Sequence, residues 1–312
     1  LCGLCNIGST CYMNATLQCL LHIPELSNYF INKYPTDNNN LKQINRDVET
    51  NGQISEEFCN IVFNVNYPDK FNNSDKIKPF SPEKYKNILG NYNPQFSRFE
   101  ANDSKDLILY LLQTMHAELN YKGNVKPPQQ YEYDERDKEQ TIKFFLHMNS
   151  NTNFSVISAL FYSILQAETI CLNCNNKFYS FQYFECLCFP MNKYHNKYFN
   201  LYQGFKDYER DEESNNEQYF CKFCQKMVKV KLNNKIYYSA EYLLIIIDYG
   251  RNKMFQPKEI DFGYIIDITR FVVSKNNING PIMYELIGVC THLGSSGGGG
   301  HYIARCKNKK KP

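Results

Sequence analysis

The sequence lacks several features that would each have indicated a class of protein. It contains no tryptophan, and its longest aliphatic run, Leu243 to Ile247, is the length of a short strand. A membrane-spanning helix needs roughly 20 apolar residues in succession, so none is expected. Charge is nearly balanced, with 35 Lys and Arg against 32 Asp and Glu and a formal net charge of +3. Because a nucleic-acid partner favours a strong basic excess, we expect neither a nucleic acid nor a membrane as a partner.

Cysteine is plentiful, but its spacing does not suggest a disulfide framework. Four of the 13 cysteines form two Cys-x-x-Cys pairs far apart in the chain. Such pairs are typical of metal ligation in a reducing compartment, so we expect an intracellular protein, cytoplasmic or nuclear. The chain begins at Leu1 with no signal-peptide pattern, and we expect it to be a piece of a longer protein.

Two kinds of periodicity divide the chain. Apolar residues recur at helical spacing in Met13–Leu21 and again in Leu107–Leu119, whereas aromatic and β-branched runs predict strands after residue 150. A helical part followed by a strand-rich part predicts an α+β fold. The length suits one large domain with subdomains or two compact ones. Three polar stretches are expected to be surface loops: Thr36–Asn40, Tyr121–Glu139 and Asp207–Glu217.

Cys11 lies where a helix is expected to begin. The preceding Asn-Ile-Gly-Ser-Thr supplies turn residues, Thr10 is placed to cap, and the residues after Cys11 carry an apolar stripe. Thiolate is the nucleophilic form of cysteine, and the partial positive charge at a helix N-terminus favours it. Cys11 is therefore the candidate nucleophile, whereas Cys19 is expected to be a small buried group. A metal pair of Cys2 and Cys5 with a distant partner is a less favoured alternative.

A cysteine nucleophile needs a base, and His301 has the most suggestive setting of the six histidines. It follows four glycines, Gly297 to Gly300, which permit close backbone approach, and a strand-like segment begins with it. His292 precedes the same glycine-rich segment and is a weaker candidate. The other four are expected to be ordinary surface or core residues: His22, His116, His147 and His195.

Three segments resemble the motifs of one family. Gly3–Leu26 resembles the cysteine box of the ubiquitin-specific proteases, which are papain-like deubiquitinating enzymes, and Tyr284–Lys307 resembles their histidine box. Ala101–Leu119 is similar to the family's Gln-Gln-Asp-Ala-x-Glu-Phe helix. The resemblance implies one papain-like catalytic domain over residues 1–312, with a helical thumb (1–120), zinc-tipped β fingers and part of the palm (150–250), and the rest of a β-rich palm (250–312).

The resemblance also implies roles for single residues. Cys11 matches the nucleophile, His301 the general base, and Asn6 the amide that holds the oxyanion, although Asn-x-Gly also suits a plain turn. Asp103 matches a carboxylate near the arginines of the ubiquitin tail, or it caps the following helix. Tyr302 matches an aromatic residue that lines the substrate channel.

The chain departs from the family pattern at three places. The family's orienting Asp or Asn follows a Trp-containing strand, and we expect that residue beyond Pro312 because the chain has no Trp and only a short segment follows His301. Ala101-Asn102 stands where Gln-Gln is usual, and Asp248–Arg251 replaces Leu-Lys-Arg-Phe. These changes affect contacts with ubiquitin more than they affect the fold.

The two Cys-x-x-Cys pairs are Cys171 with Cys174 and Cys221 with Cys224. One turn can present both sulfurs of a pair, and two such turns complete a closed tetrahedral Zn²⁺ shell. Four unrelated thiols are the alternative. The resemblance implies a structural zinc at the tip of the fingers, with no open position for catalysis and no catalytic cofactor. Cys186 and Cys188 are expected to face the core from one side of a strand.

Taken together, these features predict a thiol-dependent hydrolase that cleaves the isopeptide or peptide bond after the C-terminal glycine of ubiquitin. Its partners would be ubiquitin and ubiquitinated proteins. Two alternatives stay open: a catalytically silent ubiquitin-binding module, and a peptidase for another ubiquitin-like modifier.

Overall fold

The computed structural model describes residues 2–68, 78–98, 100–123, 125–150, 152–194, 198–209, 212–214, 219–250, 259–274, 280–294 and 300–308. The chain forms two compact units. The first comprises residues 1–125, 153–160 and 286–312, and the second comprises residues 126–152 and 161–285. The cysteine box and residues 286–307 of the histidine box, from opposite ends of the sequence, therefore belong to the first unit.

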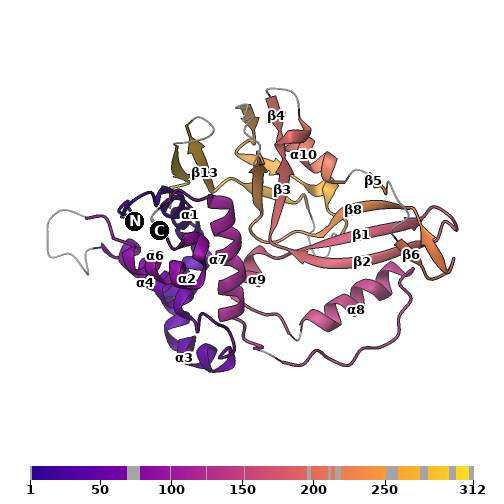
Figure 1. Ribbon diagram of the computed structural model, residues 1–312, viewed down its shortest axis with the longest axis horizontal. Coiled ribbons are helices and arrows are strands. Elements are labelled where there is room, and N and C mark those ends of the chain that lie inside the picture. Colours follow the sequence, from indigo (N-terminus) through magenta and orange to yellow (C-terminus); the bar gives the residue numbers. More distant parts are fainter. Residues whose placement is uncertain are drawn as a thin grey trace. The chain divides into compact units, whose positions relative to one another are not determined.

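Helices dominate the first unit (Figure 1). The expected apolar stripes exist: the side chains of Met13 and Leu17 in one helix and of Leu107 and Leu111 in another are fully buried. None of the helices in the described part of the chain combines the length and apolar composition needed to cross a bilayer. The helices are α1 (Cys11–Leu21), α2 (Pro24–Asn32), α3 (Tyr34–Ile44), α4 (Gln53–Asn66), α6 (Glu83–Tyr92), the 3-10 helix η1 (Pro94–Phe96), α7 (Ser104–Glu118) and α9 (Val156–Phe161), which ends at the boundary of the unit.

One β-hairpin packs on these helices. Strands β13 (Gly288–Leu293) and β14 (His301–Cys306) pair antiparallel, with Gly288 opposite Cys306 and Leu293 opposite His301. Both strands contact α1, which also contacts α7. The hairpin thus brings the histidine box against the helix that begins with Cys11.

Strands dominate the second unit (Figure 1), as the aromatic and β-branched runs predicted, so the α+β class is confirmed. A four-stranded antiparallel sheet has the order β2-β1-β8-β5. The bounds are α8 (Lys138–Ser150), β1 (Ser163–Cys171), β2 (Lys177–Phe184), β3 (Cys186–Pro190), η2 (Met191–Lys193), β4 (Tyr198–Asn200), α10 (Leu201–Tyr208), β5 (Glu212–Glu213), β6 (Tyr219–Cys221), β7 (Lys226–Val228), β8 (Val230–Tyr238), β9 (Leu244–Asp248), β10 (Glu259–Asp261), β11 (Ile265–Asp267), η3 (Thr269–Phe271) and β12 (Met283–Glu285).

Aromatic packing holds the second unit together. Helix α8 lies against β2, where the rings of Phe145 and Tyr183 are 4.9 Å apart. A separate buried cluster includes Phe189 of β3 and Phe205 of α10, whose rings are 5.4 Å apart in an edge-to-face arrangement. A Cβ added to Gly204 would lie 2.6 Å from the Phe189 ring, so α10 can approach β3 only because this position carries no side chain.

Two expectations about the loops need correction. Thr36–Asn40 is not a loop but lies within α3, where Tyr34 is buried and Thr36 donates to the carbonyl of Lys33 at 2.7 Å. Tertiary anchoring here outweighs the poor helix propensity of Asn and Thr. Asp207–Glu217 includes the end of α10 and strand β5, while residues 210, 211 and 215–218 lie outside the described residues. In Tyr121–Glu139, residues 125–137 form an irregular segment, as expected.

The expectation for Cys186 and Cys188 was also wrong. Both residues point to the same side of β3, but that side is the more exposed one, because Leu187 and Phe189 fill the core between them. The period of a strand fixes which residues share a face, and packing decides which face is buried.

Candidate functional site

Cys11 is the first residue of α1, and 8% of its surface is exposed. The chain reaches it through a tight turn with positive φ at Gly8 (111°) and Ser9 (47°). The sulfur therefore lies in the first turn of a helix, beside backbone N–H groups that have no intrahelical acceptor. This is the setting that the sequence predicted for a nucleophilic thiol.

Asn6 is oriented by Thr10, the residue that precedes Cys11. The side-chain oxygen of Asn6 accepts from the backbone N–H of Thr10 at 3.2 Å and from its hydroxyl at 3.1 Å. The same hydroxyl accepts from the N–H of Ile7 at 3.2 Å. Thr10 is the N-cap residue, but its hydroxyl does not cap α1, contrary to expectation. It serves instead to fix the Asn6 amide, with Nδ2 as the end directed away from Thr10.

His301 opens β14 and is exposed. Its strand packs on α1, and so does the neighbouring strand β13, which carries Cys290. The helix that begins with Cys11 therefore contacts both strands of the hairpin that bears His301. Of the glycine run that precedes His301, Gly297–Gly299 lie outside the described residues.

His292 is packed rather than poised at the site. Its ring lies 4.8 Å from the ring of Tyr302, the residue opposite it in the hairpin. A Cβ added to Gly300 would overlap the His292 ring, so the absence of a side chain at Gly300 leaves room for that ring. His292 is nevertheless an exposed residue, like His301.

Asp103 and Tyr302 were selected from distant motifs, and the structure places them in contact. Asp103 is the N-cap of α7, where its carboxylate accepts from the N–H of Lys105 at 2.9 Å. The capping interpretation is therefore confirmed. The Tyr302 hydroxyl donates to the same carboxylate at 3.3 Å. Burial raises the pKa of Tyr302 to about 12, and the Asp103 charge adds to this, so the phenol stays protonated as the donor.

The four cysteines of the Cys-x-x-Cys pairs gather in the second unit, with all sulfurs within 4.8 Å of one another. The Sγ atoms of Cys171 and Cys224 are 3.7 Å apart, and those of Cys174 and Cys221 are 3.8 Å apart. A tetrahedron of sulfurs around an ion at ~2.3 Å has edges of about 3.8 Å. The cluster therefore has the size of a four-thiolate metal site.

The two turns of the cluster are built alike. Each ends in a residue with positive φ, Asn175 at 57° and Gln225 at 55°, whose N–H donates to the carbonyl of the first cysteine at 2.9 Å. Hydrogen bonds from the backbone and side chain of Asn176 lower the pKa of Cys174 to about 6. Donors aimed at sulfur stabilise the thiolate form that binds metal.

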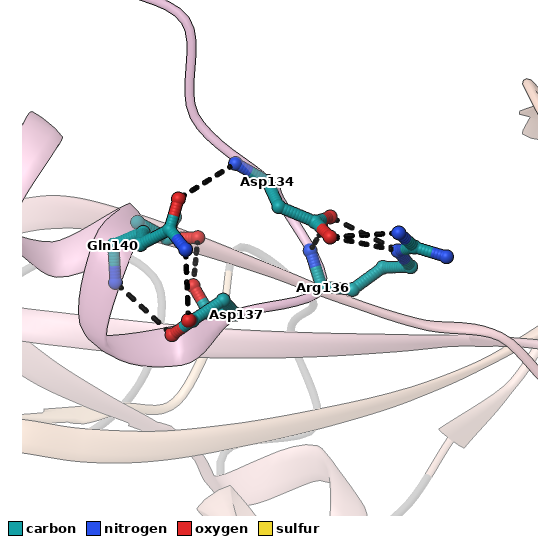
Figure 2. A network of polar contacts seen from close by, with 5 residues as sticks. Asp134, Arg136, Asp137 and Gln140 are labelled. Atoms are coloured by element: carbon teal, nitrogen blue, oxygen red, sulfur yellow. Dashed lines mark hydrogen bonds and ion pairs between the residues drawn. The ribbon is translucent and has the colours of Figure 1, made fainter.

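A segment N-terminal to α8 braces the second turn of the cluster. Figure 2 shows its polar network, in which Arg136 forms a bidentate pair with Asp134, with a closest approach of 2.7 Å. The Arg136 guanidinium lies 4.7 Å from the ring centre of Phe223, and Lys222 pairs with Glu135. Lys222 and Phe223, which lie between the two cysteines of this turn, thus contact a segment that is distant in the sequence.

Sequence reasoning missed two supports of the Cys11 turn. Thr10 was taken as a cap, and its bonds to Asn6 could not be foreseen because they require the turn to fold back on itself. Asn14, one helical turn after Thr10, donates to the carbonyl of Cys5 at 2.8 Å and ties the turn to α1. The available signal was a polar residue in the first turn of the helix. Cys2 and Cys5 do not form a pair: their sulfurs face the carbonyls of Asn64 and Pro79, respectively.

Comparison with known proteins adds to this picture. A family model described as ubiquitin carboxyl-terminal hydrolase matches residues 2–312. Ubiquitin carboxyl-terminal hydrolase 4 of Saccharomyces cerevisiae (strain RM11-1a) is 25% identical over 99% of this chain, and ubiquitin carboxyl-terminal hydrolase 5 of S. cerevisiae is 27% identical over 97%. The chain spans 35% and 40% of the length of these two relatives.

A solved structure has a similar fold. A structure of the SAGA Ubp8/Sgf11/Sus1/Sgf73 DUB module bound to ubiquitin aldehyde matches with a TM-score of 0.67 and 19% identity. The match covers 99% of this chain and 62% of the other chain. At this identity the likeness concerns the fold.

Proposed function

Because the chain belongs to the ubiquitin carboxyl-terminal hydrolase family, we propose that it is a cysteine peptidase that hydrolyses the isopeptide or peptide bond after the C-terminal glycine of ubiquitin. One observation carries the assignment of its site. The hairpin whose second strand begins with His301 packs on the helix that begins with Cys11, although 289 residues separate the two in the sequence.

In the proposed reaction Cys11 attacks and His301 moves the proton. His301 accepts the proton of Cys11, and the thiolate attacks the carbonyl carbon of the terminal glycine of ubiquitin. The tetrahedral intermediate carries its negative charge on oxygen. When it collapses, the amine leaves with a proton from His301, and an acyl-thioester with Cys11 remains. Water, deprotonated by His301, then releases ubiquitin and restores the thiol.

Asn6 is proposed as an oxyanion donor, together with the backbone N–H of Cys11. The bonds from Thr10 to the Asn6 side-chain oxygen fix which end of the amide faces away from Thr10. A donor held in place before the reaction needs no reorganisation when the charge appears, which is why such donors lower the barrier.

Asp103 and Tyr302 are proposed to line the path of the ubiquitin tail. Asp103 is exposed and carries a charge that suits an arginine, and the hydroxyl of Tyr302 holds one of its oxygens. The second carboxylate oxygen of Asp103 is then the one proposed to face the substrate. The capping bond to Lys105 uses the same oxygen as Tyr302, so capping and substrate binding are compatible.

The cysteine cluster is proposed to hold a structural zinc ion. The residues fit the group, since two of the six sulfur–sulfur distances are 3.7 and 3.8 Å, the edge length of a closed thiolate shell, and all four sulfurs lie within 4.8 Å of one another. Cys171, Cys174, Cys221 and Cys224 would hold the ion, and its binding would tie β1 to the β6–β7 pair. With four protein ligands it would leave no open position for a substrate.

The test uses the natural-length protein and ubiquitin that carries a C-terminal electrophile. We expect a covalent adduct of one ubiquitin per chain, seen by intact mass, that disappears in Cys11→Ala and persists in the control Cys188→Ala, which alters an exposed thiol of the second unit. His301→Ala should slow adduct formation. Binding of ubiquitin without an adduct would favour the silent module, and a Cys11-dependent adduct only with another modifier's probe would favour the alternative substrate.

A further inference from the structure

Two cysteines outside the proposed reaction meet inside the first unit. The Sγ atoms of Cys19 in α1 and Cys306 in β14 lie 3.9 Å apart. Both side chains are partly buried, and they come from opposite ends of the chain. Neither Cys19 nor Cys306 belongs to the four-cysteine cluster.

Gly288 lies beside these two sulfurs. It is the residue opposite Cys306 in the β13–β14 pairing. A Cβ added to Gly288 would lie 3.4 Å from the sulfur of Cys19 and 3.5 Å from its Cβ, which is ordinary van der Waals contact. The Cys19 side chain therefore packs directly against Gly288, and its sulfur reaches Cys306 on the adjacent strand.

We propose that Cys19 and Cys306 are a peroxide-sensitive dithiol that forms a reversible disulfide, and that this bond links the helix beginning with Cys11 to the strand beginning with His301. A disulfide has a sulfur–sulfur bond of ~2.05 Å. The two sulfurs therefore need to approach by about 2 Å from their present separation. Rotation of the two side chains about their Cα–Cβ bonds is the movement proposed to close this gap.

The oxidation proceeds in two balanced steps with a peroxide as the oxidant. The thiolate of Cys306 attacks one oxygen of hydrogen peroxide, the O–O bond breaks, and hydroxide leaves, which becomes water on taking up the proton lost by the thiol. Cys306 is then a sulfenic acid. The sulfur of Cys19 attacks the sulfur of Cys306, its proton goes to the leaving hydroxyl, and a second water departs. Two thiols are oxidised and one peroxide is reduced; a dithiol reductant reverses the change.

We assign the first attack to Cys306, because the hydrogen bond between the two sulfurs and burial both raise the pKa of Cys19. In the present geometry the Cys306 thiol donates to the sulfur of Cys19 at 3.9 Å, so Cys306 loses this proton before it attacks the peroxide. The disulfide formed is the same whichever sulfur reacts first. Cys290, the next cysteine on the hairpin, has its pKa raised by burial and is not expected to compete.

The disulfide would restrict the movement of α1 relative to β14 and would not take part in the proposed reaction. Cys19 follows Cys11 by about two turns of α1, and Cys306 is five residues after His301 in β14. A covalent link there would hold the helix and the strand in their present packing. It would also close a loop of nearly the whole chain, and long loops constrain the unfolded state most.

The experiment is performed on the natural-length protein carrying Cys11→Ala, so that oxidation of the candidate nucleophile does not contribute. The protein is treated with hydrogen peroxide, quenched with catalase, alkylated, digested with chymotrypsin and mapped by mass spectrometry without reduction. Cleavage after Tyr12 and Leu17 separates Cys19 from the earlier cysteines. We expect a Cys19–Cys306 linked peptide that disappears after reduction, and an unfolding midpoint higher by roughly 5 °C or more in the oxidised protein.

Two variants sharpen the result. Cys290→Ser should leave the crosslink intact, whereas Cys19→Ser should abolish it and leave Cys306 trapped as a sulfenic acid, detectable with a dimedone probe. Oxidised protein with no Cys19–Cys306 peptide, or with Cys306 joined to Cys290 instead, would overturn the proposal. Because no ubiquitin cleavage is measured, this outcome does not depend on the proposed function.

Discussion

The Thr10–Asn6 interaction gives the sharpest prediction about catalysis. Thr10 is fully buried, and its hydroxyl bridges the N–H of Ile7 and the side-chain oxygen of Asn6. Thr10→Val keeps the shape and removes the hydroxyl. The backbone N–H of Thr10 still holds Asn6 at 3.2 Å, so the amide keeps one of its two anchors.

The size of the effect follows from what each change removes. Asn6→Ala removes the side-chain donor proposed for the oxyanion, and loss of such a donor costs ~2.7–4 kcal/mol, or about 10²–10³ in kcat. Thr10→Val removes one orienting hydrogen bond of ~1 kcal/mol, and we expect kcat to fall about fivefold with little change in KM. The loss concerns the transition state, because the donor acts on charge that the bound substrate does not yet carry.

The assay measures kcat and KM with ubiquitin bearing a fluorogenic C-terminal amide. Thr16→Val is the matched control, because it also removes a buried threonine hydroxyl near the start of α1. The Thr16 hydroxyl donates to the carbonyl of Tyr12 at 2.9 Å rather than to Asn6. In the Asn6→Ala background, Thr10→Val should have no further effect on kcat. Equal kcat values for the Thr10 and Thr16 variants, or a loss below about tenfold for Asn6→Ala, would refute the role assigned to the amide.

Three further predictions concern stability, metal and substrate. The carboxylate of Glu118 accepts hydrogen bonds from two backbone N–H groups at the start of α4, at 2.7 and 3.1 Å. Glu118→Ala should therefore lower the free energy of unfolding by about 3 kcal/mol, measured by denaturant titration. The control Glu56→Ala, at an exposed residue, should lower it by less than ~1 kcal/mol. Burial raises the pKa of Glu118, so the contribution of Glu118 to the free energy of unfolding is full at low pH and declines as pH rises through the raised pKa. Glu118→Gln should remove this decline in stability. A pH profile of stability that is unchanged in Glu118→Gln would contradict the assignment. Metal analysis of the wild-type protein should find one zinc ion per chain. Cys221→Ser should lose this zinc and lower the unfolding midpoint by roughly 10 °C or more, whereas the control Cys188→Ser should retain it. Folded wild-type protein without zinc would exclude the site. Asp103→Asn keeps a residue that caps helices well but removes the negative charge. KM for ubiquitin should therefore rise about tenfold, while the free energy of unfolding stays unchanged. An unchanged KM would show that Asp103 acts only as the cap of α7.

The sequence by itself determined the features that depend on local spacing. The apolar stripes of α1 and α7 recur at helical intervals, and their members are buried as that periodicity requires. The start of a helix at Cys11 follows from the turn residues before it. The two Cys-x-x-Cys turns likewise depend on residues within a few positions of one another. In each case the interacting atoms lie within about one turn of chain, so the pattern of neighbours is sufficient.

Tertiary structure decided everything that joins distant segments or chooses a buried face. The α3 helix over Thr36–Asn40, the outward direction of Cys186 and Cys188, and the contact of Asp103 with Tyr302 each depend on what packs against them. The meeting of Cys19 with Cys306 depends on the packing of β14 against α1. Local propensities differ by less than about 1 kcal/mol per residue, whereas burying a side chain is worth ~1.5–3 kcal/mol. Where the two compete, the fold as a whole decides.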